Sequence, residues 1–387
     1  MDTTDTPRRP LLRRTSTRIA LVALLVVFAG FFAAFRFFSS TPVPFRGSGQ
    51  PMKAVVYHDY GPPDVLRLEE VEKPLPNENQ VLVRVRAAAA NPLDWHYVRG
   101  SPYVVRIGIG MFKPKDSRLG VDLAGEVVAV GSNVTQFKPG DEVFGTTGTG
   151  SFAEFARASQ NKVVLKPASI TFEQAAAVPV AALTALQGLR DHAKIHSGQK
   201  VLINGASGGV GTFAVQIAKA YGTEVTGVCS TRNVAMVRSI GADHVIDYTK
   251  EDFTTSGQRY DVIYDTVGNR SLSELRRVLV PNGIAILIGG GGPNSGGLIG
   301  SLADPIKAFL YSPFVSQKFV FFLAEIRKED LTTMRELMEA GKVKPVIDRT
   351  YTLSQAPEAI RYLEQGHARG KVVIAVAQDE KTPQLAR

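Results

Sequence analysis

The chain of 387 residues contains one cysteine, Cys229, and one tryptophan. A single thiol excludes an internal disulfide and a structural zinc lobe of four thiolates. Cys229 ends an apolar run, so its position favours a packed thiol over a reactive one. The body of the chain also lacks a Lys- or Arg-rich stripe with interleaved aromatics, which leaves nucleic-acid binding without support. Apolar content of 44% and charged content of 21% are ordinary for a globular protein.

The net charge of +9 is concentrated near the N-terminus, because residues 1–50 hold seven Arg and two Asp. Five of these arginines lie in a basic tail, residues 1–18, before the uncharged run Ile19–Phe35. If Arg36 snorkels, the apolar stretch extends to residue 38 and reaches across a hydrocarbon layer of roughly 30 Å. We therefore expect one transmembrane anchor over residues 19–38. A cleaved signal peptide is the alternative, although the run exceeds the usual length of about 7–15 residues.

The rest of the chain divides into segments that differ in composition and in the pattern of their apolar residues. Residues 39–51, rich in Pro, Gly and Ser, are typical of a linker. Short strands and Gly/Pro turns dominate residues 52–175, which indicates a β-rich domain. Over residues 176–319, helices alternate with apolar strands, and this predicts an α/β domain with a doubly wound parallel sheet. Further helices and strands follow, and the polar residues 378–387 are predicted to be a disordered tail.

A glycine-rich turn joins a strand to a helix in the middle of the chain. The apolar run Val201–Ile203 precedes it, and an Ala- and Ile-rich helical pattern continues to Gly222. A dinucleotide pyrophosphate needs a tight turn, one position without a Cβ, and a helix N-terminus that faces the anion. A second strand, Glu224–Cys229, follows at the distance that such a unit requires. The residues expected to bind the nucleotide are Gly205, Ala206, Ser207, Gly208, Gly209, Val210 and Gly211.

The end of the second strand indicates which nicotinamide cofactor binds. An NAD site carries Asp or Glu there for the ribose 2′-hydroxyl, whereas an NADP site carries hydroxyl and cationic groups. This chain reads Ser230-Thr231-Arg232, without an acid. Ser230 can donate to a 2′-phosphate, and Arg232 can bind it in bidentate fashion. We therefore predict NADPH; an ordinary loop with a solvated Arg232 is the alternative.

Several stretches, in this order and spacing, resemble the medium-chain dehydrogenase/reductase superfamily and above all its zinc-less quinone oxidoreductase branch. They are Met52–Tyr57, Asn91–Asp94, Gly120–Gly131, Lys138–Gly145, Gly205–Gly211, Tyr264–Gly268 and Gly366–Lys371. The resemblance implies a GroES-like catalytic domain over residues 52–175, completed by residues 320–377. It also implies a Rossmann domain over residues 176–319, with nicotinamide and substrate in the cleft between the two.

The residue types at the family's zinc positions argue against a catalytic metal. Zinc-dependent members carry Cys where this chain has Asn91, and Gly-His-Glu where it has Gly120-Val121-Asp122. Their third ligand falls near Pro179–Leu183, which is wholly apolar here. A catalytic zinc needs three protein ligands and an open position, and only Asp122 remains, so no metal is predicted. Without a Lewis acid, conjugated acceptors are favoured, because the charge formed by hydride attack spreads over a quinone or enone.

The resemblance also implies two catalytic residues. Asn91 would lie beside nicotinamide and substrate and donate a hydrogen bond to the acceptor oxygen; a turn-capping Asn before Pro92 is the alternative. Tyr103 falls where related enoyl reductases carry a proton-donating tyrosine, and an aromatic packed on the cleft wall is its alternative. Tyr97 is a weaker candidate for lining the substrate.

Further cofactor contacts follow from the same resemblance. Thr184 matches a threonine at the nicotinamide ring, and Tyr248 matches a tyrosine at the adenosine phosphate end. Gly268 and Gly289 end strands where the chain passes close to the cofactor, and Lys371 is an additional candidate. The alternative for Thr184 is an ordinary helix threonine, and that for Tyr248 is a surface aromatic. The two glycines could simply form tight turns, and Lys371 could be a solvated lysine at a strand edge.

These observations together indicate a membrane-anchored, zinc-independent oxidoreductase that transfers hydride from NADPH to a lipophilic quinone or α,β-unsaturated carbonyl. A membrane-tethered scaffold that keeps the cofactor as a structural element is the alternative. The apolar insert Pro293–Phe322 walls a substrate pocket or a homodimer face, or else lies on the bilayer. The membrane side stays open: the arginine tail places the body outside the cytoplasm, whereas the supply of reduced nicotinamide argues for the cytosol.

Overall fold

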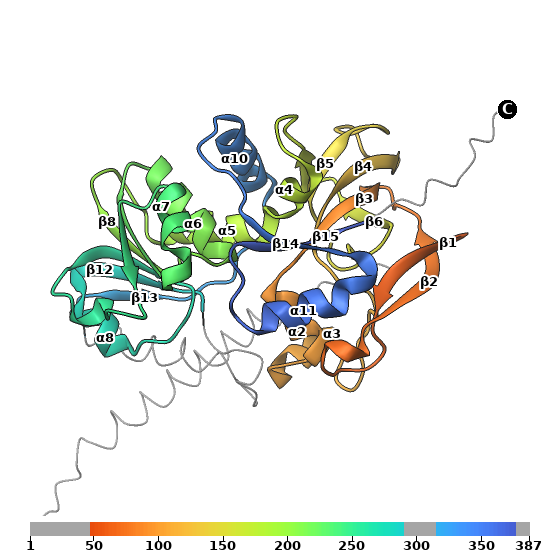
Figure 1. Ribbon diagram of the computed structural model, residues 1–387. Coiled ribbons are helices and arrows are strands. Elements are labelled where there is room, and N and C mark those ends of the chain that lie inside the picture. Colours follow the sequence, from red (N-terminus) through yellow and green to blue (C-terminus); the bar gives the residue numbers. More distant parts are fainter. Residues whose placement is uncertain (1–46, 290–314, 377–387) are drawn as a thin grey trace, which may run out of the picture.

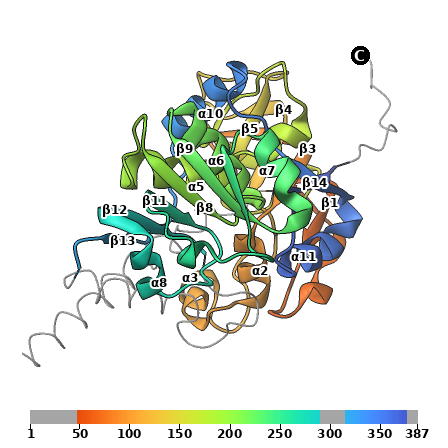
Figure 2. The ribbon, with the colours of Figure 1, turned by 60° about the vertical axis from the view of Figure 1, so that its left-hand side comes forward.

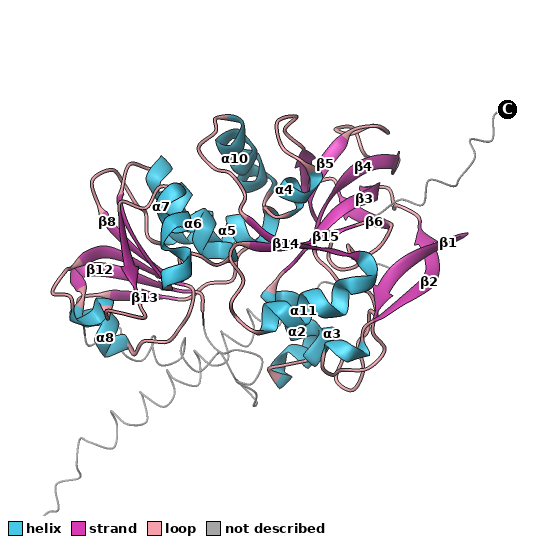
Figure 3. Cartoon of the chain, in the orientation of Figure 1, coloured by secondary structure: helices cyan, strands magenta, loops and turns pink. Residues whose placement is uncertain are grey.

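The computed structural model describes residues 47–289 and 315–376. Two large sheets lie on opposite sides of the described part of the molecule, with helices between and around them (Figures 1 and 3). The expected anchor over residues 19–38, the tail 378–387 and most of the insert 293–322 lie outside the described residues. Within residues 47–289 and 315–376, no helix combines the length and apolar character needed to cross a membrane.

The first large sheet has seven strands, in the order β14-β15-β3-β4-β5-β7, with β6 paired to β3. A separate antiparallel pair, β1 and β2, lies beside it. β15 comes from the C-terminal end of the chain and pairs antiparallel with β3. The strands are β1 (Gly47–Val56), β2 (Arg67–Pro74), β3 (Gln80–Ala90), β4 (Asp122–Val130), β5 (Glu142–Thr146), β6 (Phe155–Ser159), β7 (Val163–Leu165), β14 (Ile347–Thr352) and β15 (Lys371–Ala375).

The second large sheet has six parallel strands, in the order β10-β9-β8-β11-β12-β13. The middle residues of its central strands β8 and β11 are apolar and buried, as expected for strands covered on both faces. The predicted combination of a β-rich unit with a doubly wound parallel sheet is therefore confirmed. The strands are β8 (Lys200–Asn204), β9 (Glu224–Cys229), β10 (His244–Asp247), β11 (Tyr260–Asp265), β12 (Leu279–Leu287) and β13 (Lys318–Val320).

Helices connect the strands and join the two sheets. They are α2 (Pro92–Arg99), α3 (Arg106–Ile109), α4 (Phe172–Ala176), α5 (Pro179–Gln187), α6 (Gly209–Ala220), α7 (Val234–Ser239), α8 (Leu272–Arg277), α10 (Lys328–Glu339) and α11 (Ala356–Glu364). α5 lies between the sheets (Figures 1 and 2). Its apolar residues belong to one core that also includes Ala87 and Phe144 of the first sheet and Phe213 of α6. This shared core fixes how the two sheets are placed relative to each other.

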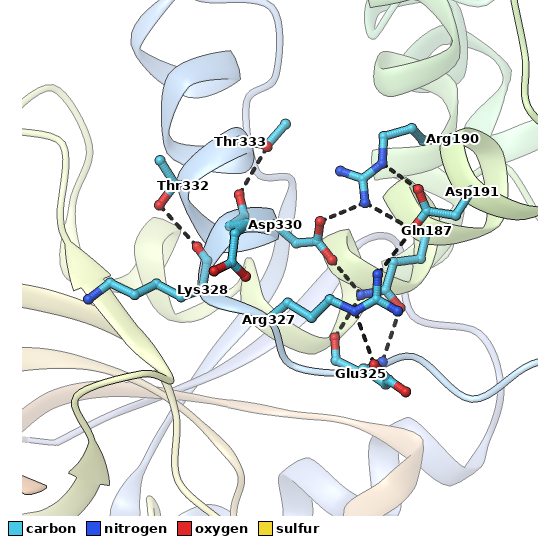
Figure 4. A network of polar contacts seen from close by, with 10 residues as sticks. Gln187, Arg190, Asp191, Glu325, Arg327, Lys328, Asp330, Thr332 and Thr333 are labelled. Atoms are coloured by element: carbon cyan, nitrogen blue, oxygen red, sulfur yellow. Dashed lines mark hydrogen bonds and ion pairs between the residues drawn. The ribbon is translucent and has the colours of Figure 1, made fainter. Parts of the chain in front are cut away.

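A polar network ties the end of α5 to the start of α10 (Figure 4). The Gln187 amide donates to Asp330 Oδ2 at 2.7 Å and to the Glu325 carbonyl at 2.7 Å. Arg190 Nη2 contacts the other Asp330 oxygen at 2.6 Å. Because Asp330 is buried, these bonds supply the partners that its carboxylate needs away from water.

Part of the apolar insert is described, and its aromatics contribute to packing. Phe319 lies on β13, at the edge of the parallel sheet, and is buried in that sheet's core. The ring of Phe322 lies 4.3 Å from that of His192. The expectation that these residues wall a pocket or rest on a bilayer is therefore wrong for Phe319, because extending the sheet by β13 buries it.

Candidate active site

The glycine turn lies at the carboxyl end of β8, directly before α6. Gly205 has a φ of +80°, and a Cβ there would lie 2.3 Å from Thr266 Oγ1. A Cβ at Gly211 would lie 2.1 Å from the Gly205 carbonyl oxygen, so this glycine permits close helix–strand packing. Gly208 differs, because the nearest atom to a Cβ there is that same oxygen at 3.4 Å. Its outward side is therefore open to a ligand.

The local geometry at this turn suits an anion. Gly208 is the N-cap of the twelve-residue helix α6 and no side chain caps it. The first amides of the helix are thus available to a phosphate, and the helix dipole favours negative charge. Ala206 is buried against the core, while Ser207 Oγ accepts a hydrogen bond from Asn233 at 3.1 Å. The residues present fit a dinucleotide pyrophosphate.

Residues at the carboxyl ends of the neighbouring strands pack close to the glycine turn. The amide of Asn204, which ends β8, donates to Asp265 Oδ1 at 2.9 Å, and the same oxygen accepts the backbone amide of Gly268 at 3.0 Å. Gly268 has a φ of +70°. A Cβ at Gly289 would lie 2.3 Å from the Thr266 carbonyl carbon. Both predicted glycines therefore occupy positions that a larger residue would strain.

A cavity of about 370 Å³ lies beyond the end of β9. It brings together all four residues predicted for the 2′-phosphate end and adds two that the sequence did not indicate. Its lining consists of Ser230, Thr231, Arg232, Tyr248, Thr249 and His367. Arg232 Nη2 donates to the His367 carbonyl at 3.0 Å, so the C-terminal segment forms one wall. His367 is distant in sequence, and no local pattern could have placed it there.

One acid lies beside this cavity, although none was expected from residues 230–232. Asp247 ends β10, which pairs in parallel with β9. Its carboxylate accepts the Thr231 hydroxyl at 2.6 Å and the Thr249 hydroxyl at 2.7 Å, and these bonds lower the pKa of Asp247 to about 2. Lys250 lies 3.5 Å from the same carboxylate. The acid is therefore engaged by its neighbours, which leaves Ser230 and Arg232 for a ligand.

A buried polar cluster lies on the other side of the glycine turn. Lys371 Nζ donates to Asn91 Oδ1 at 2.6 Å and to the Ala90 carbonyl at 3.3 Å, and lies 3.8 Å from Asp122 Oδ2. Lys371 is 3% exposed, so the alternative of a solvated strand-edge lysine is wrong. It is buried because β15, which begins at Lys371, inserts between β14 and β3.

Asn91 is fully engaged within this cluster. Its amide nitrogen donates to Asp122 Oδ2 at 2.9 Å and to the Ala89 carbonyl at 3.3 Å, and the side chain is 2% exposed. An amide nitrogen has two hydrogens, so neither is left for an acceptor oxygen in this arrangement. Asn91 is also the N-cap of α2, as its alternative interpretation held, but its side chain serves Lys371 and Asp122.

The remaining predicted residues lie in different surroundings. Thr184 is buried on α5 and its hydroxyl donates to the Val180 carbonyl at 2.7 Å. Tyr103 is 55% exposed, with the Arg106 guanidinium 4.8 Å from its ring. Tyr97 is half-buried on α2, and burial raises its pKa to about 12. The two residues predicted as catalytic therefore differ sharply, because Asn91 is enclosed and Tyr103 is open.

Comparison with known proteins places this geometry in a family. Residues 77–168 match the alcohol dehydrogenase GroES-like domain, and residues 240–374 match the family described as zinc-binding dehydrogenase. The 2-methylene-furan-3-one reductase of Solanum lycopersicum is 37% identical over 84% of this chain and 79% of its own length. The chain belongs to the medium-chain dehydrogenase/reductase superfamily, on its quinone oxidoreductase-like branch. The predicted resemblance is confirmed.

Two further relatives support this placement. The chloroplastic NADPH-dependent alkenal/one oxidoreductase of Arabidopsis thaliana is 36% identical over 84% of this chain and 79% of its own. The structure of the quinone oxidoreductase from Coxiella burnetii superposes with a TM-score of 0.74 at 32% identity, covering 85% of this chain and all of the other.

The mention of zinc in the family description does not match the residues of this chain. Across residues 47–289 and 315–376, no three His, Cys, Asp or Glu side chains gather as a cation site. The Lys371 ammonium lies against Asn91 and Asp122, where it would repel a divalent cation. Zinc-independent chemistry stays a prediction that rests on these residue types.

Proposed function

We propose that this protein is an NADPH-dependent, zinc-independent reductase of quinones or α,β-unsaturated carbonyl compounds. The observation that carries the proposal is the open Gly208 at the N-terminus of α6, with a cationic and hydroxyl-lined cavity at the end of the next strand. The first feature suits a pyrophosphate, and the second suits a ribose 2′-phosphate. The names of the relatives, which include NADPH, alkenal/one and quinone, agree with this assignment.

Each predicted cofactor contact has a place in the proposed site. Residues 205–211 bind the pyrophosphate, and the cavity residues bind the adenosine end. The Arg232 guanidinium can turn from the His367 carbonyl to a 2′-phosphate, because a charged partner makes the stronger hydrogen bond. The nicotinamide end of the cofactor would lie near Gly268, Gly289, Thr184 and Lys371.

NADPH supplies a hydride when bound, and the protein's own residues orient the acceptor and exclude water from it. No Lewis acid is needed for a conjugated acceptor, because the developing charge is delocalised over its π-system. Tyr103, exposed on the turn after α2, is the proposed proton donor to the reduced acceptor. Asn91 acts through Lys371, since its own amide hydrogens are engaged.

The sequence further supports a membrane anchor over residues 19–38, with residues 39–51 as the linker to the two catalytic domains. Attachment to a bilayer would suit a lipophilic quinone or enone, because such acceptors partition into it. A homodimer face on the insert 293–322 belongs to the same proposal.

The proposal is tested by following NADPH absorbance with the purified full-length protein and a panel of quinones and enones. We expect turnover with at least one acceptor, and turnover that survives extensive treatment with a metal chelator. Tight NADPH binding without turnover on any acceptor would instead favour the scaffold. Membrane attachment is tested separately, by comparing membrane fractionation of the full chain and of a variant with Leu24 and Leu25 replaced by Arg.

A further inference from the structure

The cluster behind the glycine turn contains more acid than base. Asp94 and Asp122 are both 0% exposed, and Lys371 is the cation beside them. Asp94 Oδ2 accepts the Asn91 backbone amide at 2.7 Å, and the Gly120 backbone amide near this carboxylate also favours its charged form. Asp94 Oδ1 is buried and makes no hydrogen bond of good geometry. A buried carboxylate oxygen without a partner strongly disfavours the charged form. If both acids were ionised, the enclosed cluster would carry one unbalanced negative charge.

This cluster contacts two elements of the proposed cofactor site, the helix α5 and the glycine turn before α6. Asp122 accepts the Val180 backbone amide at 3.2 Å, at the start of the helix that carries Thr184. Gly370, the residue before Lys371, forms a bridge with Gly208 of the glycine turn. A Cβ at Gly209 would lie 3.2 Å from Lys371 Cδ. The Lys371 stem thus packs against Gly209, the first residue of α6.

We infer that Asp94, Asp122 and Lys371 form a proton-binding site linked to the cofactor site, so that the protein takes up a proton when the anionic nicotinamide cofactor binds. The inference rests on the proposed function, because it assumes that the cofactor occupies the glycine turn. Its physical basis is Coulombic. Negative charge arriving beside the turn makes an unbalanced negative charge behind it less favourable, and a proton removes that charge.

The surroundings of the acids support titration near neutral pH. Burial raises the pKa of Asp94 to about 7 and that of Asp122 to about 6, while Lys371 opposes both shifts. Burial lowers the pKa of Lys371, and the two acids oppose that shift. Tyr97 of α2 and Tyr57, directly after β1, also face Asp94, and both have raised pKa values, so they keep their protons.

Linkage makes the effect reciprocal: if cofactor binding favours the protonated cluster, protonation favours cofactor binding to the same extent. Reduction of a quinone or enone by NADPH consumes one proton overall, in addition to the hydride. If the cluster takes up a proton when the cofactor binds, that proton is already in the protein before the acceptor arrives. Affinity for the cofactor should fall as pH rises through the range in which the acids lose their proton.

The test is calorimetric titration of the full-length protein at about pH 7, in two buffers with different ionisation enthalpies. NADH is used first, because it lacks the 2′-phosphate, whose own ionisation would contribute an opposite proton change; NADPH follows. We expect wild type to take up a measurable fraction of a proton per NADH bound, and less uptake at about pH 5 and pH 9. Asp94→Asn keeps an acceptor for the Asn91 amide but cannot titrate, so its uptake should be close to zero.

Asp59→Asn is the matched control, because Asp59 is exposed and pairs only with a surface lysine in the described chain, Lys113. It should retain the wild-type uptake. Infrared difference spectra on adding NADH give a second readout in the wild type, where the absorption of a protonated carboxyl group should increase. Binding heats that are independent of buffer, or unchanged uptake in Asp94→Asn, would overturn this inference. Absence of NADH and NADPH binding at every pH would instead overturn the proposed function.

Discussion

Replacement of Gly208 by valine separates cofactor binding from folding more cleanly than any other change at the glycine turn. Gly208 has a φ of −83°, which any L-residue adopts, and a Cβ there meets only the Gly205 carbonyl oxygen at 3.4 Å. That distance is an ordinary contact. The main cost to the fold is the poor N-cap preference of valine, about 1 kcal/mol in the free energy of unfolding.

The cost to cofactor binding should be larger. The valine side chain projects into the space where the pyrophosphate approaches the amides of α6, so the phosphate is displaced from at least one of them. A hydrogen bond to a charged group contributes about 1.5–3 kcal/mol. Loss of one such bond weakens NADPH binding roughly tenfold to a hundredfold. Fluorescence titration with NADPH measures this effect, and urea denaturation measures the stability of the same preparation.

Gly211→Ala is the informative comparison. A Cβ at Gly211 would lie 2.1 Å from the Gly205 carbonyl oxygen and 2.9 Å from Ala206 Cα, so backbone must move to admit it. We expect destabilisation by about 1–3 kcal/mol, as for overpacking elsewhere. NADPH affinity within twofold of wild type in a folded Gly208→Val protein would refute the position assigned to the pyrophosphate.

Three further predictions concern charge. Arg232→Glu should shift cofactor preference toward NADH, as the ratio of NADPH to NADH dissociation constants will show; an unaltered ratio removes Arg232 from the site. Asp330→Ala should lower the free energy of unfolding by roughly 2 kcal/mol, because Arg190 and Gln187 lose a buried partner. Urea denaturation measures this loss, and Glu329→Ala, an exposed change on the same helix, should leave the free energy of unfolding nearly unchanged. Asp94→Asn should raise stability at about pH 8 relative to wild type and have little effect at about pH 4.

The sign of the last prediction follows from proton linkage. The pKa of Asp94 is raised to about 7 in the folded protein, so between its unfolded value and 7 the folded state binds the extra proton. Stability from this group is therefore greatest at low pH and is lost as pH rises through that range. The comparison of variant with wild type cancels the other titrating groups. A stability difference that does not change with pH would show that Asp94 is not the group responsible.

Local patterns were sufficient for the parts of this protein that depend on neighbours in sequence. The strand before the glycine turn, the turn itself and the helix after it lie where the pattern predicts them, since glycine positions and apolar periodicity act within a few residues. The strand Glu224–Cys229 has the predicted bounds. The basic and hydroxyl residues at its end line one cavity with Tyr248, because adjacent parallel strands end at the same edge of the sheet.

Tertiary structure alone decided the properties of the residues that approach the cleft from elsewhere in the chain. The sequence marks Lys371 as a cofactor candidate only through the family resemblance and leaves a solvated lysine as the alternative, whereas the insertion of β15 beside β3 buries it against Asn91 and Asp122. His367 reaches the cavity beyond β9 by the same return of the chain. Burial and charge proximity arise from contacts between residues hundreds of positions apart, so a lysine's pKa or an aspartate's missing partner cannot be read from a local pattern.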